Sequence, residues 1–155
     1  MGYHQRGPRW VSAGASMRNR AKRREGLLQR FQTSSRERLS HAAQQLSTTE
    51  PSRTQVDEVR QSLTTMQGEA HMLGLPSLSS FVELVLDELA GRPTPTKLAR
   101  TGVGLEQLRE WFEHPLVEDA EAQARLEGGR SRLNGVRMRP SEWASERAAL
   151  DHAAS

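Results

Sequence analysis

The stretch LTTMQGEAHMLGLP, residues 63–76, completes the most regular apolar pattern in this chain of 155 residues. It continues a stripe with successive spacings of 3, 4, 3, 4 and 3 residues, formed by Val56, Val59, Leu63, Met66, Ala70 and Leu73. Such spacing keeps all these side chains on one face of an α-helix and is typical of helices that pack in a bundle. Gly74 suits a left-handed helix cap, and Pro76 follows within two residues. The pattern therefore predicts a helix that has Pro51 in its first turn and ends at Gly74.

Three further segments carry apolar residues at spacings of three and four, which predicts helices over about residues 26–47, 76–91 and 96–113. The second of these has an apolar face wide enough for burial on two sides, whereas Gly102 and Gly104 weaken the pattern of the last. No segment alternates in the manner of a strand. Four helices joined by short loops predict an all-α fold, an up-and-down four-helix bundle over residues 26–114.

The two ends of the chain differ from this middle part in composition. Residues 1–25 combine seven arginines and lysines with the single acid Glu25, alongside glycine, proline and serine. They predict a basic, disordered arm that becomes helical near its end, and translation could begin at Met17 instead of Met1. Residues 115–155 predict a flexible tail, with LEGGRSRLNG at 126–135 as a linker and one short helix over 141–153.

Composition narrows the possible functions. There is no cysteine, so disulfides, thiol nucleophiles and thiolate metal sites are excluded. No apolar run approaches the roughly 20 residues of a membrane span, and the N-terminus lacks the apolar segment of a signal peptide. A soluble cytoplasmic protein is the simplest interpretation. The net charge of +3 comes from the arm, which carries +6, while residues 26–113 carry −2 and residues 114–155 carry −1.

The polar side of the helix that ends at Gly74 presents Arg60, Thr64, Gly68 and His71 away from the core. Thr64 and His71 are seven residues apart, so they lie almost on one line, two turns or roughly 10 Å from each other. Glycine inside a regular helix costs about 1 kcal/mol relative to alanine. Gly68 therefore suggests a place where another molecule approaches the helix closely.

The segment TTMQGEAHMLGL, residues 64–75, resembles the signature of histidine phosphotransfer (Hpt) domains, which is approximately H-T-x-K-G-x-A-x-x-L-G. The matching residues are Thr65, Gly68, Ala70, Leu73 and Gly74. The resemblance extends over about residues 27–112, and the helix order is similar to that of the N-terminal Hpt domain of chemotaxis-type kinases. It implies a four-helix bundle in two-component or chemosensory phosphorelay signalling, with a receiver domain or a histidine kinase as partner.

The sequence departs from this signature at the reactive position, where Thr64 replaces the phosphorylated histidine and Gln67 replaces the usual lysine. Imidazole holds a phosphoryl group in a P–N bond from which it can be passed on, whereas a threonine phosphate ester is too stable for that. Glutamine cannot supply the positive charge of lysine. We therefore expect a degenerate Hpt-like module without a catalytic residue, which docks its partner through Arg60, Thr64, Gln67, Gly68 and His71.

Two alternatives stay open. His71 could accept phosphate in place of Thr64, although Gly68 lies three residues before it instead of four after it. The basic segment RNRAKRRE, residues 18–25, could bind the phosphates of a nucleic acid, although no aromatic residues lie between its basic residues.

Enzymatic and metal-dependent functions find no support in the sequence. Asp57 and Glu58 fit a charged outer face better than a metal site, and so do Glu83, Asp87 and Glu88. The glycines of GVG, at 102–104, follow no strand and form no phosphate loop. ATP-binding motifs of a kinase are absent. We expect no enzyme, no metal and no cofactor.

Overall fold

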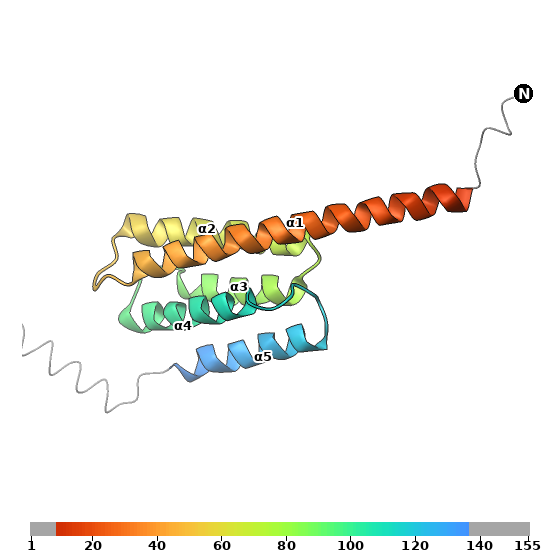
Figure 1. Cartoon of the computed structure of the whole chain (residues 1–155). Coiled ribbons are helices and arrows are strands. Elements are labelled where there is room, and N and C mark those ends of the chain that lie inside the picture. Colours follow the sequence, from red (N-terminus) through yellow and green to blue (C-terminus); the bar gives the residue numbers. More distant parts are fainter. Residues whose placement is uncertain (1–8, 137–155) are drawn as a thin grey trace, which may run out of the picture.

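The computed structural model describes residues 9–136, which contain five helices and no strand. The helices are α1 (Arg9–Leu46), α2 (Arg53–Met72), α3 (Pro76–Glu88), α4 (Pro95–Trp111) and α5 (Ala120–Gly135). Each of α1 to α4 packs against two others of the four, in the cyclic order α1, α2, α3, α4, and α5 covers α3 and α4 (Figure 1). The prediction of an all-α helical bundle is confirmed, and a fifth helix is added to it.

The core lies between α1 to α4 and continues under α5. Phe31 of α1 meets Phe112 edge to face, with 5.5 Å between the ring centroids, and Phe81 of α3 stacks on Trp111 at 5.9 Å. The apolar stripe of α2 is buried as expected from Val56 to Ala70, and Leu73 packs partly buried at its end. These aromatic contacts join α1 and α3 to the C-terminal end of α4.

The ends of α2 follow the rules of helix capping. Ser52 is the N-cap, and its hydroxyl accepts a hydrogen bond from the Gln55 N–H while the Gln55 side chain accepts one from the Ser52 N–H. Pro51 thus precedes the helix, and the prediction that it lies in the first turn is wrong by two residues. Gly74 has a φ of 74°, which confirms the left-handed cap.

Helix α1 differs from the predicted disordered arm. It is helical from Arg9, and its first part projects beyond the bundle (Figure 1). Arginine, lysine, alanine and methionine have high helix propensity, so the scarcity of apolar residues predicts the lack of packing but not the backbone conformation. Arg24 Nη2 donates a hydrogen bond of 2.9 Å to the Leu73 carbonyl, which joins the projecting part to the end of α2. Residues 1–8 lie outside the described part of the chain.

Helix α5 corrects the prediction of a linker over residues 126–135. It begins at the N-cap Asp119, whose carboxylate accepts a hydrogen bond from the Ala122 N–H, and it buries Ala122 and Leu133. A Cβ atom on Gly129 would lie 2.6 Å from Cε2 of Phe81. Gly129 therefore allows α5 to pack closely against α3 and does not indicate a flexible segment. The short helix predicted over residues 141–153 lies outside the described residues.

Candidate functional site

The solvent-facing side of α2 is the candidate site, and we call it the α2 face. It consists of residues at the helical positions opposite the buried stripe, namely Gln61, Thr64, Thr65, Gly68, His71 and Met72, which are all exposed. Helix α1 borders the α2 face through an ion pair of 3.3 Å between Arg38 and Glu69. On the other border, Arg60 donates a hydrogen bond to the Leu89 carbonyl at the end of α3. The α2 face is therefore held between two neighbouring helices.

Thr64 is exposed on this face, but its hydroxyl is engaged. Thr64 Oγ1 donates a hydrogen bond of 2.8 Å to the Arg60 carbonyl one turn earlier. Among the described residues, Thr64 has neither an imidazole nor a carboxylate as a hydrogen-bond partner. A hydroxyl needs an adjacent base to become a strong nucleophile. The arrangement provides an open position without an activated acceptor group.

Gly68 lies near the centre of the α2 face. No atom outside its own helical turns comes within 4 Å of the place that a Cβ would occupy. None of the described helices therefore approaches the glycine closely enough to require it. The helix tolerates an unfavourable residue at a point where the surface is open to another molecule.

His71 lies one turn beyond Gly68 and is also exposed. No described residue forms a hydrogen bond or ion pair with its imidazole. Access to His71 is therefore open, and it is separated from Thr64 by two helical turns, as expected. His41 on α1 is exposed as well.

Arg60 and Gln67 flank the α2 face on the side of α3. The Arg60 guanidinium forms an ion pair of 2.9 Å with Asp57, in addition to its bond to Leu89. Gln67 is half-buried, and its backbone carbonyl accepts a hydrogen bond of 3.4 Å from Ser79 Oγ of α3. The two residues are seven positions apart, so both lie on the same side of α2, which is the side nearest α3. They belong to the rim of the α2 face instead of its centre.

Sequence reasoning missed Met72, whose exposed fraction is 85%. It lies four residues after Gly68 and therefore on the same side of α2. A large apolar side chain at a polar helix position is the signal that could have drawn attention to it, and single exposed apolar residues of this kind are common on protein surfaces. Thr65 and Gln61 also lie on the α2 face, where Thr65 Oγ1 donates a hydrogen bond of 3.1 Å to the Gln61 carbonyl.

Acidic residues near the site are occupied by other interactions. Asp57 pairs with Arg60, and Glu58 accepts a hydrogen bond from the Gln45 side chain. On α3, Glu88 pairs with Arg100 of α4 at 3.2 Å. Within the described residues, no group of three or more histidine, aspartate or glutamate side chains could hold a metal ion.

A shallow groove of about 460 Å³ runs along the N-terminal half of the α2 face. It is lined by Thr54, Asp57, Glu58, Arg60, Gln61, Thr64 and Thr65. The candidate position Thr64 thus lies at the end of a depression lined by polar and charged residues, where a protruding part of a docked protein can make contact.

These features define a helical bundle with an open face on its second helix. The model of the Hpt domain family matches residues 26–114, and the chain belongs to this family. An Hpt domain is a phosphotransfer module that works with kinases and receivers, in contrast to a catalytic kinase domain, so family membership implies a role in phosphorelay signalling. Searches of curated proteins and of solved structures returned no match. No helix within the described residues is long and apolar enough to cross a membrane.

Proposed function

We propose that this Hpt domain is a docking module that binds its phosphorelay partner but accepts no phosphoryl group at Thr64. The partner is a receiver domain or a histidine kinase, and it binds to the α2 face in the cytoplasm. Bound in this way, the module competes with an active phosphotransfer domain or holds a kinase in place. Chemosensory signalling is the pathway that its sequence resemblance favours.

The environment of Thr64 carries this proposal. Its hydroxyl donates to the Arg60 carbonyl and has no base among its hydrogen-bond partners in the described residues. A phosphate ester formed there would be too stable to transfer its phosphoryl group to an aspartate. Gln67, half-buried on the rim, offers no positive charge to a phosphoryl group. The position has the exposure of an acceptor site and lacks its chemistry.

Docking is supported by the open surface around Gly68. The absence of any neighbour within 4 Å of its Cβ position leaves the helix backbone accessible, and the exposed Met72 offers apolar contact area beside it. A partner surface that packs on Gly68 covers Thr64 and His71 as well, since they lie one turn to either side.

Substituting Gly68 by tryptophan tests the docking model. We expect the affinity for receiver and kinase domains from the same organism to fall about tenfold or more, because the indole occupies the space of the partner. Gly102→Trp on α4 is the matched control, since nothing lies within 4 Å of the Cβ position of Gly102 either. Calorimetric titration measures the affinity, and circular dichroism checks that both variants are folded. Equal affinity in the two variants would contradict docking at Gly68.

Phosphate transfer to His71 is a second candidate function, favoured by the exposure of its imidazole. In that case a phosphorylated partner would label the wild-type protein, and His71→Ala would abolish the label. Our proposal expects no label on the wild type.

Nucleic-acid binding is a third candidate, favoured by the exposed basic side chains on the projecting part of α1, which include Arg18, Arg20, Lys22 and Arg23. It predicts binding to duplex DNA or RNA that weakens steeply with salt and is lost from a chain that lacks residues 1–25. Retained binding in the shortened chain would exclude this part of α1 as the binding element.

A further inference from the structure

One side of α1 faces α2 and continues past the end of α2. Gln45, Arg38 and Arg24 each form a side-chain hydrogen bond to α2. These positions are 7 and 14 residues apart, so they lie nearly on one line along α1. Arg24 already reaches the carbonyl of Leu73, which caps α2. Met17, seven residues before Arg24, is the next position on this line, and it lies on the part of α1 that projects beyond the bundle (Figure 1).

We call this continuation the α1 extension, which consists of Met17, Arg20, Ala21 and Arg24. All four residues are exposed, and the exposed fraction of Met17 is 69%. Residues 16–25 contain five basic residues and the single acid Glu25, which gives them a net charge of +4. Arg20 forms no ion pair with any described residue. Arg20 and Arg24 are four residues apart, so both side chains leave α1 on the same side.

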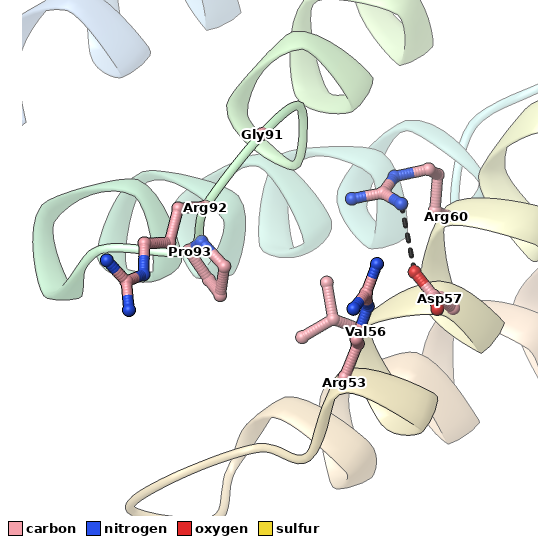
Figure 2. Close-up of a pocket in the computed structure, with 7 residues that line it drawn as sticks. All are labelled: Arg53, Val56, Asp57, Arg60, Gly91, Arg92 and Pro93. Carbon is pink, nitrogen blue, oxygen red and sulfur yellow. Dashed lines mark hydrogen bonds and ion pairs between the residues drawn. The ribbon is translucent and has the colours of Figure 1, made fainter.

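The start of α2 has a different arrangement of charges. Figure 2 shows an ion pair of 2.9 Å between Arg60 and Asp57, whereas the side chains of Arg53 and Arg92 point away from each other. Asp57 and Glu58 also line the groove along the α2 face. The cations at the start of α2 are thus paired or divergent. A negatively charged surface is attracted more strongly to the end of α2, where two arginines lie on one side of α1.

The α1 extension joins the α2 face at the end of α2. Leu73, whose carbonyl binds Arg24, directly follows Met72, which is 85% exposed. Leu73 lies five residues after Gly68, about 7.5 Å further along the helix axis. A stable interface covers about 800 Å² of each partner, which corresponds to a patch roughly 30 Å across. A partner centred on Gly68 therefore extends past the end of α2 and reaches Arg24 and the adjoining turn of α1.

The composition of the α1 extension favours a protein as its ligand. Methionine and arginine are enriched in protein interfaces, whereas lysine and glutamate are depleted there. Arg24 lies between Met17, two turns further out, and Met72, which adjoins the carbonyl that Arg24 binds. The phosphates of a nucleic acid would bind the arginines and leave both methionine side chains without an apolar contact.

We propose that the phosphorelay partner makes a second contact on the α1 extension, where acidic side chains of the partner bind Arg20 and Arg24 and an apolar side chain packs on Met17. This inference rests on the proposed docking to the α2 face and adds the chemistry of the partner. The partner is a receiver or kinase domain that carries carboxylates beside its docking surface. Charges at the edge of an interface mainly raise the association rate and discriminate between partners. The α1 extension therefore selects among domains of similar shape.

Charge reversal on the two sides of α1 tests this contact in the full chain. Arg20→Glu places an acid on the α1 extension. Lys22→Glu makes the same change of net charge on the opposite side of α1, because two residues correspond to about 200° around a helix. For receiver and kinase domains of the same organism, we expect Arg20→Glu to lower the affinity about tenfold or more and Lys22→Glu to lower it by about threefold or less. The difference should shrink as salt is added, since screening weakens exposed charge pairs.

Met17→Gln separates a protein ligand from nucleic acid. Glutamine keeps the length and helix propensity of methionine, so the helix is preserved while the apolar contact is lost. We expect binding of the partner domain to weaken by about threefold. Duplex DNA, titrated in parallel, should bind the wild type and Met17→Gln equally weakly. Isothermal titration calorimetry measures the affinities, and circular dichroism checks that all variants are folded.

Equal affinities of Arg20→Glu and Lys22→Glu for the partner domain would overturn the proposal. DNA binding by a chain that binds none of the receiver and kinase domains would overturn it as well, and would assign the projection to nucleic acid. Gly68→Trp distinguishes this contact from the docking itself. A loss in Gly68→Trp with equal affinities of the two charge variants contradicts the α1 extension alone, whereas unchanged affinity in Gly68→Trp contradicts docking on the α2 face.

Discussion

Gly68 is an unfavourable residue for the stability of α2, yet it leaves the surface of the helix accessible. A glycine in a helix interior lowers stability, and the open surface above Gly68 shows no compensating contact within the described residues. Thr64 is also exposed, and among the described residues its hydroxyl has no hydrogen bond to a base that could activate it. Sequence reasoning placed both residues off the core correctly, because the stripe of α2 fixes the orientation of every side chain along the helix. It could not foresee that Arg60 and Gln67 turn toward α3, since this depends on the packing between helices.

Replacing Gly68 by alanine should raise the free energy of unfolding by about 1 kcal/mol, because alanine is the better helix former and its Cβ meets nothing. Urea denaturation measures this change. Gly104→Ala on α4 serves as the contrast, since a Cβ there would lie 2.6 Å from Cγ2 of the buried Val85, and it should lower stability. A loss of stability in Gly68→Ala would mean that the glycine serves the fold instead of docking.

At the scale of helices, α2, α3 and α4 were predictable from the sequence, whereas α5 and the first part of α1 were not. A spacing of three and four residues between apolar side chains identifies a helix only when one of its faces is buried, and the basic part of α1 buries little. In α5, two adjacent glycines suggested a linker. Only the position of Phe81 reveals that one of them permits close packing.

The two glycines of α5 should respond differently to the same substitution. Gly129→Ala should lower the free energy of unfolding by about 1–3 kcal/mol, since the new Cβ would lie 2.6 Å from the ring of Phe81, which is fully buried and stacked on Trp111. Gly128→Ala should leave stability unchanged or raise it by up to about 1 kcal/mol, because nothing lies within 4 Å of its Cβ position. Thermal unfolding compares the pair. Equal effects would show that α5 does not pack against α3 as described.

At the scale of the whole molecule, the packed unit extends beyond the residues that match the Hpt family. The match ends at residue 114, while α5 continues the core with Ala122 and Leu133. Family membership fixes the phosphorelay context. The basic first part of α1 projects beyond the bundle, whereas the α2 face lies on the bundle itself (Figure 1). We assign partner docking to the α2 face.

The most direct test of the central claim is phosphoryl transfer from radiolabelled, phosphorylated receiver domains of the same organism to three proteins: the wild type, His71→Ala and Thr64→His. We predict no label on the wild type or on His71→Ala. We predict an acid-labile label on Thr64→His, because docking brings the phosphoryl group to this position and the substitution supplies the imidazole that accepts it. A labelled wild type that loses its label in His71→Ala would contradict the account.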